Sequence, residues 1–318
     1  MKKTIYFIMI AVCLMVSLVG CNQAGDDGKR FVDKDKISIV TTIYPVYDFA
    51  LNIAGDKAEI INLVPTGVEP HNFELSPKDM QLIEEADLFI YNGAGMENFV
   101  DKTLNAIQNE NLVIVECAKD VTLLESHHSH HEEEHEEEHE EEHDAKVDPH
   151  TWLSVQNAIV AIEYMKDALI TLDKENAQYY EDNYRAYKDE LLELDALYQA
   201  ELKDLPRDTI VVNHEAFGYL CEAYGIHQVG IEGLSADSEP DSTRMKEIID
   251  FCKEEDIQVI LFEELVSPKV AKTVASEIGA KTMVLNPIGG LTAEQEANGK
   301  NYIELMKDNL EVLKTALQ

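Results

Sequence analysis

Eleven histidines occur in the chain, and seven of them lie in one short segment, HHSHHEEEHEEEHEEEH at residues 127–143. Neutral imidazoles and carboxylates are metal ligands, so this segment is a candidate metal-binding tract. Its nine glutamates repel one another near neutral pH, and it has no apolar residue to bury, which predicts a solvated segment with several weak metal sites. We call it the His/Glu tract; its histidines are His127, His128, His130, His131, His135, His139 and His143.

The tract matches H-E-x-x-H, the helical motif of zinc peptidases, at three successive positions. A peptidase helix needs an apolar face beside its substrate cleft, and the tract has none. His214-Glu215 is followed by Ala-Phe-Gly, without a second histidine at the fifth position. A secreted zinc hydrolase is therefore the less favoured alternative, although three ligands and a water would also serve catalysis.

Three of the four histidines outside the tract stand in comparable places. His71 follows an expected strand, His150 precedes a long amphipathic segment, and His214 ends the first strand of the second half. The carboxyl ends of parallel strands face the ligand crevice, so we expect these imidazoles to meet. They would hold one Zn²⁺ tightly at about 2.0–2.1 Å, with a carboxylate or a water as fourth ligand. His227 opens a strand, at the opposite end, and is left out.

Two acidic residues stand at the same spacing before two of these histidines, in Glu69-Pro70-His71 and Asp148-Pro149-His150. The proline fixes the backbone direction directly before the imidazole. Each carboxylate could orient its histidine or supply the fourth metal ligand. Each could equally be an ordinary carboxylate of a surface turn.

The elements that would position these residues alternate between short β-rich runs and helical patterns. We expect an α/β fold with two lobes, each a mainly parallel four-stranded sheet with flanking helices, and the metal in the cleft between them. The N-terminal lobe would span 37–172, including the tract, and the C-terminal lobe 206–318. The expected strands are 37–42, 58–64, 87–93, 111–117, 209–215, 227–233, 257–264 and 281–287, and Ser76-Pro77 marks a helix start.

A long segment without glycine or proline, residues 174–203, separates the two sets of strands. Its apolar and aromatic residues recur in steps of three and four, which predicts one continuous helix face. We expect a bridging helix over 173–205. A coiled coil competes with this interpretation, but the stripe lasts under three heptads. The stripe consists of Tyr180, Tyr184, Tyr187, Leu191, Leu194 and Tyr198.

The chain has 318 residues and a formal net charge of −36, with 62 acidic and 26 basic residues. That length suits two ordinary domains. The negative charge repels phosphate backbones, so no nucleic-acid partner is expected.

Residues 1–20 have the pattern of a signal peptide, with a basic start at Lys2 and Lys3 and a short apolar run. Leu18-Val19-Gly20-Cys21 follows it and is typical of a lipidation site at Cys21; an ordinary signal peptide with an incidental cysteine is the alternative. Residues 21–36 are polar and suit a tether. We expect an extracytoplasmic lipoprotein anchored to the cell membrane.

Three further cysteines, Cys117, Cys221 and Cys252, are widely spaced. Their odd number and spacing do not make a disulfide framework. A bridge between Cys221 and Cys252 is conceivable, but buried thiols are favoured.

The lipobox, the two sets of strands, the bridging helix and four motifs together resemble a family. The motifs are EPHNFELSP, DPHTW, NHEAFGYL and a histidine-acid tract before DPHTW. Their order is similar to that of the solute-binding lipoproteins of zinc-uptake ABC importers. The resemblance covers nearly the whole mature chain. It implies two lobes joined by one long helix and a metal carried, without catalysis, by a monomer to an ABC permease and its ATPase.

The resemblance also bears on the choice of metal. Manganese-type relatives usually have a carboxylate where this chain has His214, and imidazole favours zinc over hard cations. Zn²⁺ is therefore the expected cargo, with a manganese or iron carrier of the same family as the alternative. A metal-storing surface adhesin is a further option that suits the lipid anchor equally well.

One position departs from the family pattern. Zinc relatives often have an acid after the last strand, where this chain has Gly289. A water, Glu69 or a tract glutamate could complete the site, whereas Asn286 reads better as a turn residue. We interpret the tract as an accessory with weak metal sites near the cleft.

Overall fold

The computed structural model describes residues 30–125, 147–234 and 240–318. The His/Glu tract, the signal peptide and the lipidation site at Cys21 lie outside the described residues. Contacts divide the chain into two units, and the unit described below is Asp33–Gln318.

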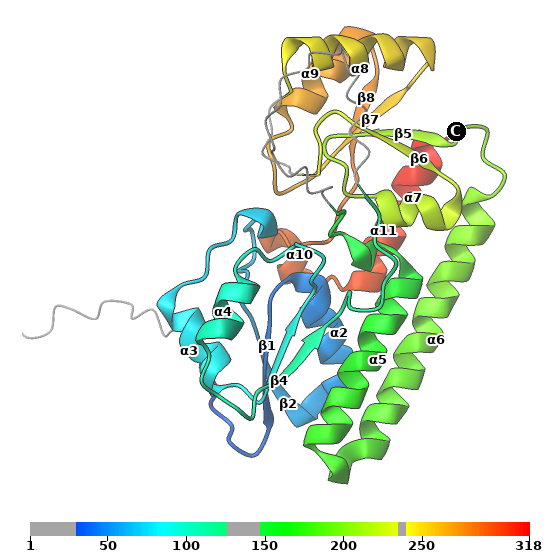
Figure 1. Cartoon of the computed structure of the whole chain (residues 1–318). Coiled ribbons are helices and arrows are strands. Elements are labelled where there is room, and N and C mark those ends of the chain that lie inside the picture. The colour runs from blue at the N-terminus through cyan, green and yellow to red at the C-terminus, as the bar shows by residue number, and fades with distance from the viewer. Residues whose placement is uncertain (1–29, 126–146, 235–239) are drawn as a thin grey trace, which may run out of the picture. The chain divides into compact units, whose positions relative to one another are not determined.

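Eight short strands form two parallel sheets with the same topology (Figure 1). The strand orders are β2-β1-β3-β4 and β6-β5-β7-β8. This arrangement confirms the expected α/β fold with two four-stranded sheets, although each strand is shorter than its apolar run. The strands are β1 Ile37–Thr41, β2 Ala58–Asn62, β3 Leu88–Tyr91, β4 Val113–Glu116, β5 Thr209–Val212, β6 His227–Gly230, β7 Val259–Phe262 and β8 Lys281–Val284.

Helices connect the strands, as parallel pairing requires. The predicted start at Ser76 is confirmed, because Ser76 and Asp79 cap each other's backbone at the start of α3. The α-helices are α2 Tyr44–Ala54, α3 Pro77–Glu85, α4 Val100–Ala106, α5 Val155–Leu172, α6 Ala177–Leu202, α7 Gly218–Tyr224, α8 Ser242–Glu254, α9 Lys269–Ile278, α10 Ala293–Ala297 and α11 Tyr302–Ala316. Short 3₁₀ turns are η1 Gly55–Lys57, η2 Pro70–Asn72, η3 Thr151–Leu153 and η4 Lys174–Asn176.

The long helix expected between the two sets of strands is α6, with 26 residues. It begins later than the sequence pattern suggested, because η4 forms a separate turn before it. All six residues of its predicted stripe are buried. The stripe packs against α5, α2 and α11 of the same chain, and α5 and α6 run side by side (Figure 1).

The last helix, α11, packs against α2 in the first half of the chain. The Tyr302 ring of α11 lies 4.8 Å from the Phe49 ring of α2, and the Tyr198 hydroxyl of α6 donates to the Met306 carbonyl at 2.6 Å. Residues from both ends of the chain therefore share one hydrophobic core. The domain boundaries at 172 and 206 stay a prediction, because contacts group both sheets in one unit.

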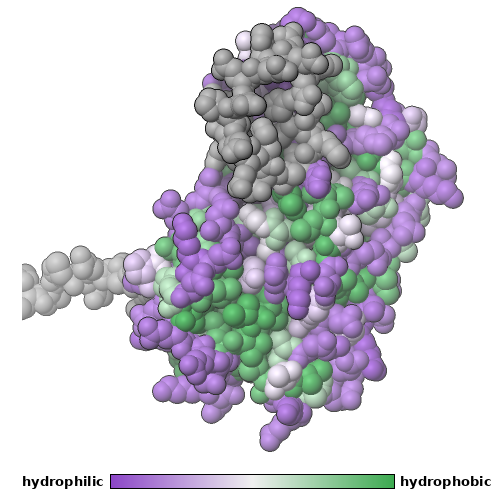
Figure 2. All heavy atoms as spheres, viewed as in Figure 1, coloured by the Kyte–Doolittle hydropathy of each residue, from purple (hydrophilic) through white to green (hydrophobic). Residues whose placement is uncertain are grey.

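Cys117, Cys221 and Cys252 are buried and unbonded, which confirms the buried thiols and excludes a bridge between Cys221 and Cys252. Among the described residues, no helix is both long and apolar enough to span a membrane. Hydrophilic residues cover much of the face drawn in Figure 2, with hydrophobic residues gathered mainly in its lower half.

Candidate metal centre

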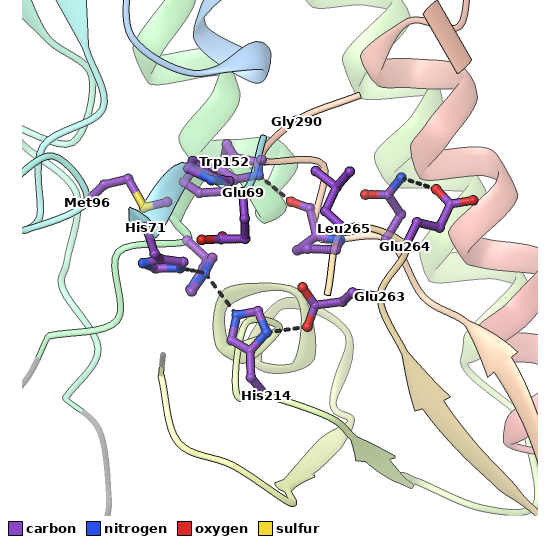
Figure 3. A pocket seen from close by; sticks show the side chains of 14 residues that line it. Glu69, His71, Met96, Trp152, His214, Glu263, Glu264, Leu265 and Gly290 are labelled. Carbon is purple, nitrogen blue, oxygen red and sulfur yellow. Dashed lines mark hydrogen bonds and ion pairs between the residues drawn. The ribbon is translucent and has the colours of Figure 1, made fainter. Parts of the chain in front are cut away.

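The three histidines chosen from the sequence meet at one point (Figure 3). One possible ligand atom from each of His71, His150 and His214 lies within 4.8 Å of the other two. The Nε2 atom of His150 is 3.0 Å from that of His71 and 3.3 Å from that of His214. Two ligands at zinc's usual bond length and a tetrahedral angle stand about 3.3 Å apart. The two separations from His150 are therefore close to those of tetrahedral zinc ligands.

His150 is held by its own acidic neighbour. The Asp148 carboxylate accepts hydrogen bonds from the His150 backbone N–H at 2.9 Å and from Nδ1 at 2.8 Å. Because Nδ1 carries the proton, the Nε2 lone pair of neutral His150 faces the centre of the site. This position of Asp148 favours the orienting role over that of a metal ligand.

The loop that carries His150 is fixed to the end of the first sheet. The Asn92 side chain, one residue after β3, donates to the Pro149 carbonyl at 2.8 Å and accepts from the Thr151 hydroxyl at 2.9 Å. Glu97 in turn accepts the Asn92 N–H at 2.8 Å. His150 has 1% of its surface exposed, so its ring is buried in this packed loop.

Strand register explains the environment of His214. Val212 of β5 is in register with Leu261 of β7, so the residues two positions further on, His214 and Glu263, stand side by side. The Nδ1–H group of His214 donates to the Glu263 carboxylate, which leaves Nε2 directed at the site. Sequence reasoning missed Glu263. Its place directly after β7, beside the strand before His214, is the signal that could have found it.

His71 lies on η2 and is only partly buried, unlike the other two histidines. Its neighbour Glu69 has a buried carboxylate oxygen, Oε2, without a hydrogen-bond partner in the structure. Pro70 packs closely on Gly289, where a Cβ atom would lie 2.9 Å from the Pro70 Cγ. Glycine at 289 therefore removes the acid of the family pattern and lets the Glu69–His71 turn pack against the segment after β8.

The pKa values of four groups at the site are shifted, and burial contributes to each shift. Burial lowers the pKa of His150, and the nearby His214 lowers it further. For His214, burial lowers the pKa, but the charge and hydrogen bond of Glu263 raise it, and the net shift is upward. Burial raises the pKa of Glu69 to about 7, against the opposing effect of His214. Burial also raises the pKa of Asp148 to about 7, against the hydrogen bond from His150. Protons therefore compete with a metal ion near neutral pH.

The open space at the site is small. It measures about 20 Å³, which admits one or two water molecules. Apolar side chains of Met96, Trp152 and Leu265 line it beside the polar groups (Figure 3). The site therefore has room for an ion and a water.

Two residues that the sequence placed outside the ligand set are His227 and Asn286. His227 opens β6 and is exposed, as expected for a residue outside the site. The Asn286 side chain accepts the Ile288 N–H at 2.7 Å, which confirms it as a turn residue, although it also borders the open space. Among the described residues, no His, Cys, Asp or Glu group other than the three histidines could hold a metal ion.

Comparison with known proteins gives consistent matches over nearly the whole chain. The chain is 40% identical over 316 residues to the Bacillus subtilis high-affinity zinc uptake system protein ZnuA, covering 99% of this chain and 98% of that one. It is 37% identical over 318 residues to the zinc-binding lipoprotein AdcA of Streptococcus pneumoniae, covering 98% of this chain but only 60% of AdcA. The crystal structure of the Zn(II)-bound ZnuA-like domain of that AdcA superposes with a TM-score of 0.76 at 36% identity, covering 89% of this chain and 99% of the domain.

In the described part of the chain, two parallel sheets and one set of three imidazoles, two of them buried, define a metal-binding α/β protein. The family model described as zinc-uptake complex component A, periplasmic, matches residues 39–316. The chain belongs to this family.

Proposed function

We propose that this protein captures Zn²⁺ outside the cytoplasm and delivers it to a membrane importer. The convergence of the Nε2 atoms of His71, His150 and His214 carries this proposal. Two of these imidazoles have Nδ1 bonded to a carboxylate, which directs their Nε2 atoms at an ion. The names of the relatives, a zinc uptake protein and a zinc-binding lipoprotein, support the same cargo.

The ligand set favours zinc over manganese or iron. Three imidazoles form a nitrogen-rich site, whereas Mn²⁺ prefers carboxylate, carbonyl and water oxygens. The spacing of the Nε2 atoms, 3.0 and 3.3 Å, suits tetrahedral zinc. A manganese or iron carrier is therefore the weaker alternative within the family.

Glu69 is our candidate for the fourth ligand. Its Oε2 atom is buried and has no hydrogen-bond partner among the described residues, which favours Glu69 over a tract glutamate. Its oxygens are not part of the group that already lies within 4.8 Å, so the carboxylate would turn toward the bound ion. Glu263 bonds the far side of the His214 ring and is therefore placed to orient that ring.

Delivery would follow the pattern of the family. The partners we propose are an ABC permease and its ATPase, with this chain acting as a monomer held at the membrane by lipidated Cys21. The lipobox and the polar residues after it support the anchor, and the family description as a periplasmic uptake component supports the location. The His/Glu tract would act as an accessory with weak metal sites.

One observation supports a zinc hydrolase as a second candidate. A carboxylate with a pKa of about 7, Glu69, beside three imidazoles is an arrangement that could activate a metal-bound water. The open space of about 20 Å³ opposes this function, because it cannot hold a peptide or an ester beside the ion. Turnover of any ester or peptide by the zinc-loaded protein would revive it. An additional adhesin role stays a hypothesis, which binding to laminin, the ligand named for a solved structure of 30% sequence identity to this chain, would test.

The decisive experiment is metal analysis of the protein purified without added metal, followed by competition between Zn²⁺ and Mn²⁺. We expect one tightly bound zinc per chain, and we expect its loss in the variant with all three histidines replaced by alanine. His227→Ala is the matched control, because it removes an exposed imidazole outside the site. Tight binding that survives in the triple variant would contradict the proposed site. Preference for Mn²⁺ would favour the alternative cargo.

A further inference from the structure

The two chain ends that flank the His/Glu tract meet in a short antiparallel pair. We call this pair the stem; it consists of Leu124, Glu125, Val147 and Asp148. Glu125 pairs with Val147, and the Asp148 N–H donates to the Leu124 carbonyl at 2.8 Å. In a regular antiparallel pair, the Leu124 N–H would donate back to the Asp148 carbonyl.

The hydroxyl of Tyr219 takes the place of that second hydrogen bond. It accepts from the Leu124 N–H at 3.2 Å and donates to the Asp148 carbonyl at 2.8 Å. Tyr219 belongs to α7 in the second half of the chain and is 3% exposed. Both strands of the stem are therefore bonded to one buried side chain far away in the sequence.

Asp148 also faces the metal site through its side chain. Its carboxylate accepts two hydrogen bonds from His150, and only Pro149 separates the two residues. The same carboxylate packs on the start of α7, where a Cβ atom on Gly218 would lie 2.5 Å from Oδ2. Any displacement of Asp148 would therefore move a proposed zinc ligand.

We propose that Tyr219 is a positioning residue that isolates the zinc site from forces on the His/Glu tract. This inference rests on the proposed function. The tract carries nine glutamates, and their mutual repulsion acts on the chain ends to which the tract is joined. The Tyr219 hydroxyl bonds both Leu124 and Asp148 to α7, so the two residues resist that force together. Because Asp148 stays in place, His150 keeps its orientation. Without the hydroxyl, the described residues of the stem keep the direct Asp148–Leu124 hydrogen bond and the Glu125–Val147 pair.

A double-mutant cycle tests this role. Zinc affinity and the rate of zinc release to a chelator would be measured for the full chain, Tyr219→Phe, a deletion of residues 127–143, and the combination. We expect Tyr219→Phe to weaken zinc binding about 10-fold in the full chain, the lower end for losing an outer partner of a ligand. In the deletion background we expect a change within about 2-fold, because the source of the force is gone. Salt near 1 M, where the screening length is about 3 Å, should also reduce the loss in the full chain.

Tyr198→Phe is the matched control. It removes an equally buried hydroxyl that donates to a backbone carbonyl at 2.6 Å away from the stem. It should lower the melting temperature of the metal-free protein about as much as Tyr219→Phe while leaving zinc affinity unchanged. Equal losses of affinity from Tyr219→Phe with and without the tract would overturn the isolating role, as would no loss in the full chain. A wild-type chain without tight zinc binding would overturn the proposed function itself.

Discussion

The two acid-Pro-His tripeptides of this protein share a sequence pattern but differ in structure. In Asp148-Pro149-His150, the short carboxylate folds back onto the N–H and Nδ1 groups of its own histidine, and the histidine is 1% exposed. In Glu69-Pro70-His71, the longer carboxylate keeps one buried oxygen without a partner, and the histidine is partly exposed. Under the proposed function, the first tripeptide would supply a fixed ligand with its support, and the second would supply a partly exposed ligand with a second donor beside it.

The largest expected effect comes from removing the fixed ligand. His150→Ala should lower zinc affinity by more than the roughly 100-fold limit typical of an outer partner, because the remaining two imidazoles make a poor tetrahedral site. His71→Ala and His214→Ala should also abolish tight binding. Competition with a chromogenic chelator measures each loss. If His71→Ala keeps tight binding, then His71 is structural and the comparison of the two tripeptides fails.

The second prediction compares the two acids. Asp148→Asn should weaken zinc binding by about 10–100-fold, because the neutral amide no longer fixes the tautomer and charge of His150. Glu69→Gln should weaken zinc binding only about 10-fold, since a water can replace the fourth ligand.

Two controls accompany these variants. Glu74→Gln changes the same charge at an exposed position near Glu69, and Asp167→Asn does so at a carboxylate 63% exposed. Calorimetry of zinc binding measures all four variants. A larger loss from Glu69→Gln than from Asp148→Asn would reverse the roles assigned here.

The third prediction concerns pH. Both carboxylates have a metal-free pKa of about 7, raised by burial, so each holds about half a proton at pH 7. Zinc favours the ionised forms, so binding should release about one proton from this pair at pH 7, beyond any from His214, and almost none above about pH 8.5. Affinity should therefore fall as pH falls from about 8 to 5. Calorimetry in buffers of different ionisation enthalpy counts the protons, and Glu69→Gln should reduce the count by about half.

The smallest effect is expected from deleting residues 127–143. The tight site should change by less than about 2-fold, while additional weak zinc sites disappear, because a charged and solvated segment loses conformational entropy when it binds. Stoichiometry by metal analysis distinguishes the two classes of site. A weakened tight site would mean that a tract glutamate, and not Glu69, is the fourth ligand.

Sequence patterns predicted the sheets and the three histidines because these depend on local information. Apolar runs predicted the eight strands, and the carboxyl ends of these strands placed His71 after a strand of one sheet and His214 after a strand of the other. The contacts that Glu263 and Tyr219 make could not be predicted in that way. Glu263 reaches His214 only through the register of β5 with β7, and Tyr219 reaches Asp148 only through the packing of α7. The packing of α11 against α2 also depends on contacts between residues far apart in the sequence, and no local pattern predicts it.

The packing of α11 against α2 affects the order in which the chain can fold during synthesis. The Tyr302 ring packs beside Phe49 in the shared hydrophobic core. Its hydroxyl donates to the carbonyl of Trp152 at 2.6 Å, and Trp152 stands two residues after His150. A chain synthesised from its N-terminus lacks this support until nearly all of it has emerged, so the first half cannot finish folding as an independent unit. The three histidines would therefore reach their final arrangement last, and a chain truncated before Tyr302 should not form the proposed zinc site.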